Sequence, residues 1–257
     1  MIKDTAQQIL DEAKAARSLL SKTKPILVGN VESAPASLYL RNYAGCILNR
    51  HIDIYDDTIF LLENDRYQAA CTVSRAMIET YAFGKYLYSK LHDALVKDES
   101  VAANEAVLEL ILKFINSSRY KVGEQEKLKK GTFSLEDYSF TPQAIERMSM
   151  GLAGSEHVMN ALRKLYKEEK AHLSSDESRF EQTYDILSEW VHPSQTSVFH
   201  HYVEETHQIP TSVGFVNLFD SAALQCALAI HFIADAENQY ECAMRIADEM
   251  ERRASES

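Results

Sequence analysis

The feature that most constrains the fold is the segment 69–91, which reads AACTVSRAMIETYAFGKYLYSKL. It contains no proline, and its apolar side chains point in almost every direction on a helix of about 3.6 residues per turn. A helix that is apolar on all sides is normally buried among other helices. We therefore predict that a helix over residues 66–92 forms the centre of a helical bundle.

Arg75 and Glu79 are two of the charged residues within this predicted helix. Their spacing places them on one face, where they can form an ion pair, and an unpaired buried charge is very costly. The best candidates for further polar partners are Ser188 and His192 in the segment SEWVHPS, residues 188–194. Pro193 disfavours helical geometry at His192, so a helix should end there. The dipole of that helix would favour the protonated form of the histidine.

The rest of the chain also predicts helices, because its 257 residues include only 8 glycines and 5 prolines. The N-terminal amphipathic helix is expected within residues 1–24, and a polar tail over 252–257 is expected to fray. We predict an all-α fold of about seven to nine helices, without a convincing strand, in a single domain over residues 1–257. Besides the central helix, apolar periodicity predicts helices over 36–64, 101–115, 155–172, 176–191 and 216–251.

The charge balance argues against a general nucleic-acid or anionic-membrane surface, since 38 acidic residues oppose 27 basic ones. A local basic surface remains possible in the segment 120–140, where glycines predict an exposed loop. Its candidate substrate-binding residues are Lys121, Lys127, Lys129 and Lys130. A second basic run at residues 163–170 is interrupted by glutamates and is open to two interpretations, a solvated face or a surface for RNA or a protein partner.

The chain is predicted to be soluble and cytoplasmic. Its N-terminus lacks the apolar core of a secretory signal, and the longest apolar stretch, residues 222–234, is too short to span a bilayer. No pair of the four cysteines has CxxC spacing. Cys46, Cys71 and Cys226 stand among apolar neighbours, which predicts free, buried thiols in a reducing compartment.

Two patterns suggest metal ligands. Residues 169–172 and 204–207 both read Glu-x-x-His, the spacing used in di-iron helical bundles. Both lie near predicted helix ends among charged residues, so we interpret them as solvated helix termini. His51, Asp53, Asp56 and Asp57 could hold a divalent ion, but an exposed helix face is the commoner arrangement. We therefore predict no metal and no cofactor.

The Arg-x-x-x-Glu pattern at 75–79, followed by Ser-x-x-x-His-Pro-Ser at 188–194, resembles an uncharacterised family of bacterial helical proteins akin to the HEPN superfamily (higher eukaryotes and prokaryotes nucleotide-binding). The resemblance covers roughly residues 36–200 in layout. It implies a helical homodimer, often with metal-independent ribonuclease activity, acting in toxin–antitoxin or anti-phage systems. Catalytic members carry an arginine shortly before the histidine, whereas this chain has Asp185, Ile186 and Leu187 there. Either Arg75 supplies the missing arginine from another helix, or the protein is not a nuclease.

Two hypotheses for function follow. In the first, RNA or a nucleotide binds at a pocket formed by Arg75, Glu79, Ser188 and His192, with Tyr86 and the lysines of 121–130 contributing to substrate binding. Arg75 would bind phosphate, His192 would act as general acid or base, and Glu79 would orient one of them. In the second, the protein is a non-catalytic helical sensor or scaffold. Its Arg–Glu–His network is structural, and its output is a contact with a protein partner.

Overall fold

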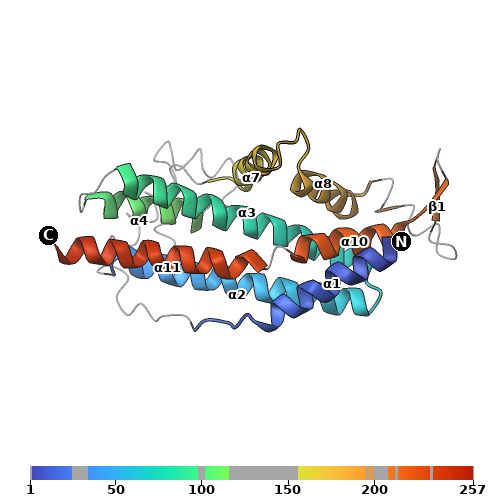
Figure 1. Cartoon of the computed structure of the whole chain (residues 1–257), viewed down its shortest axis with the longest axis horizontal. Helices are drawn as coiled ribbons and strands as arrows, with labels where there is room; N and C mark the ends of the chain where they lie inside the picture. Colours follow the sequence, from blue (N-terminus) through green and yellow to red (C-terminus); the bar gives the residue numbers. More distant parts are fainter. Residues whose placement is uncertain are drawn as a thin grey trace, which may run out of the picture. The chain divides into compact units, whose positions relative to one another are not determined.

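The computed structural model describes residues 2–24, 34–97, 102–115, 156–194, 197–198, 208–211, 214–231 and 234–256 (Figure 1). These residues are almost entirely helical, which confirms the predicted all-α class. The helices are α1 (Ile2–Ser18), α2 (Ala36–Glu63), α3 (Tyr67–Lys97), α4 (Ala102–Ile115), α7 (Val158–Leu173), α8 (Arg179–Val191), α10 (Leu218–His231) and α11 (Ala234–Ser255). None of the helices in this described part is long and apolar enough to cross a membrane.

The turn between α2 and α3 forms where the sequence predicts it, at Asn64 and Asp65. Asp65 takes a positive φ of 56°, in the left-handed region that aspartate and asparagine tolerate better than most residues. The amide of Arg66 donates to the carbonyl of Leu61, and the side chain of Asn64 donates to the carbonyl of Phe60. The last carbonyls of α2 are thereby satisfied, and α3 begins directly after the turn.

A short hairpin precedes the C-terminal helices, and the sequence analysis missed it. Strands β1 (Gln208–Thr211) and β2 (Gly214–Asn217) pair antiparallel, with Pro210 opposite Phe215. Proline argues against a central strand, but a two-stranded hairpin consists only of edges and accepts it. The helix predicted over 216–251 therefore starts two residues later, at Leu218. It is described as α10 and α11, between which residues 232–233 lie outside the described part.

The chain divides into two compact units, each assembled from three separate segments. Unit 1 comprises residues 1–22, 48–82 and 162–238, and unit 2 comprises residues 23–47, 83–161 and 239–257. Helices α2 and α3 each contribute residues to both units. The single domain expected over 1–257 stays a prediction.

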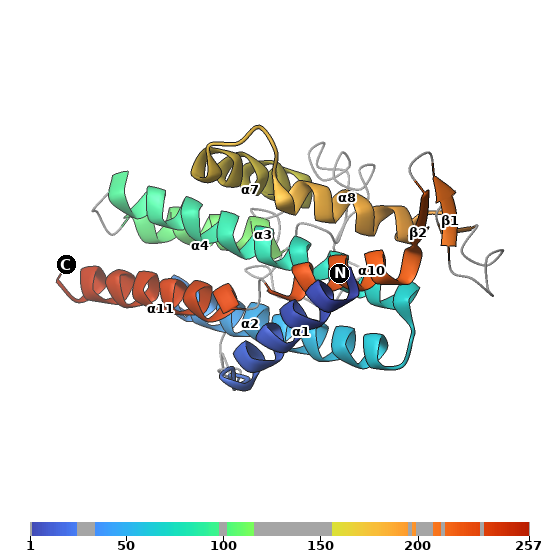
Figure 2. The same ribbon diagram turned by 45° about the vertical axis from the view of Figure 1, so that its right-hand side comes forward.

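In unit 1, α1 lies beside α10 (Figures 1 and 2). Alanines on one side of α1, Ala6 and Ala13, are buried. The polar side of α1 forms ion pairs with α2, of which Arg17 to Asp56 at 2.8 Å is one. The amphipathic pattern of the first 24 residues thus matches a helix that is apolar toward the core and charged toward a neighbouring helix.

In unit 2, α11 lies alongside the first part of α2, and α4 lies beside the second half of α3 (Figure 2). Arg41 on α2 pairs with Asp248 and Glu251 on α11. The core of this unit is an apolar cluster contributed by all four helices. Its fully or nearly fully buried members are Leu40, Ala44, Leu87, Tyr88, Leu91, Leu95, Val107, Ile111, Phe114, Ala243, Ile246, Ala247 and Met250.

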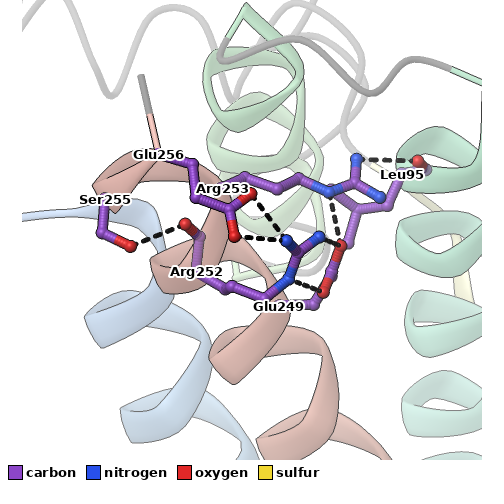
Figure 3. Close-up of polar contacts among 6 residues, drawn as sticks. All are labelled: Leu95, Glu249, Arg252, Arg253, Ser255 and Glu256. Carbon is purple, nitrogen blue, oxygen red and sulfur yellow. Dashed lines mark hydrogen bonds and ion pairs between the residues drawn. The ribbon is translucent and has the colours of Figure 1, made fainter.

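The last turn of α11, which is helical to Ser255, carries several charged contacts, and the fraying expected over 252–257 stays a prediction. Arg252 binds both Glu249 and Glu256, while Arg253 binds Glu249 (Figure 3). Arg253 also donates to the carbonyl of Leu95 in the last turn of α3, at 2.9 Å. An arginine that caps the last carbonyls of another helix ties the two helix ends together within unit 2.

Candidate polar site on α3 and α8

Three polar side chains in unit 1 form a closed triangle between α3 and α8. Arg75 donates from Nη2 to the hydroxyl of Tyr184 at 2.7 Å, and that hydroxyl donates to Oε1 of Glu79 at 3.0 Å. The third side is the ion pair between Arg75 Nε and Glu79 Oε1, at 3.2 Å. The guanidinium carbon also lies 4.8 Å from the centre of the Tyr184 ring, within the range of a cation–π contact.

Helix α8 positions Tyr184 through a well-defined start and a buried stripe. Ser178 caps its N-terminus by accepting from the amide of Glu181, and Glu169 on α7 accepts from the Ser178 hydroxyl and the Phe180 amide. The helix therefore begins at Arg179, three residues later than the predicted start at 176. The buried residues of α8 recur at helical spacing, namely Phe180, Thr183, Tyr184, Leu187 and Trp190. Tyr184 belongs to this stripe, so its hydroxyl reaches α3.

The triangle is partly open to solvent. The side chain of Arg75 is 22% exposed and that of Glu79 is 32% exposed. Burial raises the pKa of Tyr184, the hydrogen bond from Arg75 opposes that shift, and the nearby Glu79 reinforces it. The phenol therefore stays protonated at neutral pH and can donate to Glu79. Among the described residues, no group accepts a hydrogen bond from Nη1 of Arg75.

Ser188 and His192, the predicted partners of Arg75, take other positions. The Ser188 hydroxyl donates to the carbonyl of Tyr184 in the preceding turn of its own helix, at 2.7 Å. His192 ends α8, as Pro193 predicts, and its amide donates to the carbonyl of Ser188. Its imidazole is exposed and makes no hydrogen bond or ion pair to any residue that the structure describes. Ser188 follows Tyr184 by one turn of α8, and His192 lies one turn further on, as the extended residue that caps the helix.

Tyr184 is the member of the site that sequence reasoning missed. The histidine at the end of α8 is the predicted partner of Arg75, whereas the contact is made two turns earlier by Tyr184. One signal could have found it: Tyr184 stands one turn before Ser188 and shares the apolar stripe of its helix, so its ring had to face the core.

Of the predicted substrate-binding residues, the structure describes Tyr86. Tyr86 belongs to unit 2, where its ring centre lies 5.6 Å from that of Phe114 and Lys90 Nζ lies 4.6 Å from it. Lys90 also pairs with Glu156 at 2.8 Å. The other four predicted residues, at 121, 127, 129 and 130, lie outside the described part of the chain.

The patterns that suggested a metal have other partners. Glu169 caps α8, and His172 is exposed at the end of α7, while the second Glu-x-x-His pattern lies outside the described residues. Asp53 and Asp56 pair with Lys22 and Arg17. Within the described ranges, no three histidine, cysteine, aspartate or glutamate side chains are grouped closely enough to hold a metal ion.

Comparisons with family models, with curated proteins and with solved structures found no significant match to this chain.

Proposed function

We propose that the protein binds a phosphate-bearing ligand, RNA or a nucleotide, at Arg75 in unit 1. The single observation that carries the proposal is the state of this arginine. Its guanidinium is held by Glu79 and Tyr184, yet its side chain is partly exposed and Nη1 has no partner among the described residues. An arginine fixed in this way loses little conformational freedom on binding a phosphate, which it can contact with its remaining N–H groups.

The other residues have distinct roles in this proposal. Glu79 and Tyr184 position Arg75, and His192 moves the proton during cleavage of a phosphodiester as general acid or base. Because His192 is exposed at the end of α8, two turns after Tyr184, a chain-like ligand bound at Arg75 can extend along α8 to His192. Ser188 lies between them. Phosphate recognition is local here, since the net charge of −11 opposes general attraction of nucleic acid.

The biological setting that accompanies this proposal is the one implied by the resemblance to HEPN-like proteins. The protein is a cytoplasmic homodimer of a toxin–antitoxin or anti-phage system, and a protein partner such as an antitoxin restrains it. An unrestrained ribonuclease would arrest the cell that makes it, which explains why such a partner would be needed.

A second candidate function is that of a non-catalytic helical scaffold or sensor with protein partners. The observation that favours it is the closure of the triangle: each of Arg75, Glu79 and Tyr184 interacts with both of the others. A connected network of this kind fixes how α8 packs on α3 without any ligand. In this case Arg75 contributes stability, and His192 has no role.

His192 separates the two candidates, because its side chain has no described contact whose loss would destabilise the fold. The experiment measures binding and cleavage of a single-stranded RNA oligonucleotide, and binding of ATP, by wild type, His192→Ala and Arg75→Ala. Arg179→Ala is the matched control, since Arg179 is an exposed arginine on α8, the helix that ends at His192. Thermal melts of all four proteins accompany the assays.

Under the phosphate-site proposal, wild type cleaves RNA and His192→Ala binds it with an unchanged melting temperature but does not cleave. Arg75→Ala loses affinity and shows a weaker salt dependence, by a slope of about 0.7 for one lost contact to single-stranded nucleic acid. Arg179→Ala behaves as wild type. If wild type neither binds nor cleaves, and Arg75→Ala only melts earlier, the proposal is wrong and the scaffold function is supported.

A further inference from the structure

Two cysteine side chains meet in the core of unit 1. Cys71 on α3 and Cys226 on α10 are separated by 155 residues in sequence, yet their sulfur atoms lie 3.8 Å apart, with the Cys226 thiol donating to Cys71. Both residues are fully buried. The other two cysteines differ: Cys46 is exposed, against the prediction that it is buried, and Cys242 is partly exposed.

We propose that Cys71 and Cys226 form an oxidation site, at which hydrogen peroxide converts the two thiols into an intramolecular disulfide joining α3 to α10. The sulfurs already face each other in direct contact. A disulfide requires a separation of about 2.0 Å, so they must approach by about 1.8 Å. This inference does not depend on the proposed phosphate site.

The helices can make this approach because several residues beside the two thiols are small, although Ile230, one turn after Cys226, is large and fully buried. On α10, Ala222 and Ala229 lie one turn on either side of Cys226 and are fully buried. On α3, Ala70 precedes Cys71 and Ser74 follows it by one turn, and both are also fully buried. Small side chains let two helix backbones move closer without displacing bulky neighbours, unlike the leucines and aromatic residues elsewhere in the core.

The reaction balances with the peroxide as the only oxidant. One cysteine thiolate attacks a peroxide oxygen and the O–O bond breaks, which leaves a sulfenic acid on that sulfur and releases hydroxide, protonated to water. The second thiolate attacks the sulfenic sulfur and displaces its hydroxyl group as a second water. Two thiols are oxidised, one S–S bond forms, and one peroxide is reduced to two waters.

Burial sets when this reaction can occur. The hydrogen bond from Cys226 and burial both raise the pKa of the Cys71 thiol, so the closed core holds an unreactive, protonated thiol. Attack therefore requires transient opening of the contact between α3 and α10. Once the core closes again, the disulfide is shielded from reductants. Because Arg75 lies one turn after Cys71 on α3, the bond also ties the backbone next to Arg75 to α10.

The test uses the full-length chain with Cys46→Ser and Cys242→Ser, so that only the buried pair can form an intramolecular bond. The reduced protein is treated with hydrogen peroxide with and without urea below the unfolding transition. It is then denatured, alkylated with iodoacetamide and mapped by mass spectrometry. Cys226→Ala in the same background is the matched control, because it retains Cys71 and all methionines.

We expect a cross-linked peptide containing Cys71 and Cys226, formed faster in the presence of urea. The cross-linked protein should melt at a higher temperature than the reduced protein, since the bond restricts the unfolded chain. The control should show neither effect. If both cysteines are recovered alkylated after treatment under both conditions, the inference is wrong. A cross-linked protein that melts at a lower temperature would overturn it as well, because the bond would then distort the native core.

Discussion

Buried His51 predicts a specific loss of stability in mild acid. The residue is fully buried on α2, its Nδ1 lies 3.0 Å from the sulfur of Met77, and its Nε2 has no partner among the described residues. Burial, reinforced by the charge of Arg50, lowers the pKa of His51 from 6.5 to about 4. The folded protein therefore holds this imidazole neutral at pH values where the unfolded chain has already protonated it.

Proton linkage gives the sign and the size of this loss of stability. Between pH 6.5 and pH 4 the unfolded state binds one more proton at His51 than the folded state. As the pH falls through this range, His51 therefore lowers the free energy of unfolding by about 1.4 kcal/mol per pH unit. The contribution is complete above pH 6.5, and its loss levels off at about 3 kcal/mol below pH 4.

Urea unfolding from pH 4.5 to 7.5, compared between wild type and His51→Leu, measures this contribution directly. Leucine has a similar volume and does not titrate. The free energy of unfolding of the variant should therefore depend less steeply on pH than that of wild type, by about 1.4 kcal/mol per pH unit. His92→Gln is the matched control, because His92 is exposed and its replacement should leave the slope unchanged. If wild type and His51→Leu show the same slope, His51 titrates normally, and the argument from burial is refuted.

Three further changes test the packing by urea unfolding. Tyr184→Phe keeps the ring beside Arg75 but removes the hydroxyl that links it to Glu79, and should lower the free energy of unfolding by about 1 kcal/mol; an unchanged value would mean that the link is not formed. Ser178→Ala removes the cap of α8 and should lower it by about 1 kcal/mol, whereas Ser178→Asn should restore much of the loss. Leu91→Ala opens a cavity in the core of unit 2 and should lower the free energy of unfolding by about 2–5 kcal/mol. Leu19→Ala, at an exposed position, is the control, and an equally small loss for both variants would contradict the burial of Leu91.

The helices were predictable because their periodicity is strong and turn-forming residues are few. The predicted central helix over 66–92 corresponds to α3, Tyr67–Lys97. The prediction ends the helix too early because the residues after Leu91 are polar. Those residues do not end the helix, since Leu95 belongs to the buried core of unit 2. The hairpin was missed because strands of four residues show too little alternation to be recognised, and Pro210 argued against one of them.

The candidate site was only partly predictable, for a physical reason. The need of Arg75 and Glu79 for partners correctly indicated that α8 packs against them. Which residue of α8 makes the contact depends on how that helix is rotated and shifted along α3, and the apolar stripe decides the rotation. Sequence spacing alone does not give the shift, so His192 was favoured over Tyr184, two turns away.

The partial exposure of Arg75 and Glu79 determines how well their roles can be tested. A fully buried ion pair cannot lose one partner without destabilising a protein strongly, by about 3–5 kcal/mol. Nε of Arg75 is itself buried, but the two side chains are 22% and 32% exposed, so the pair contributes closer to the 0–1 kcal/mol typical of exposed pairs. Replacing Arg75 should therefore leave a folded protein. A loss of phosphate binding by Arg75→Ala would then report on the ligand rather than on the fold, and together with the exposed His192 it distinguishes a phosphate site from a structural link.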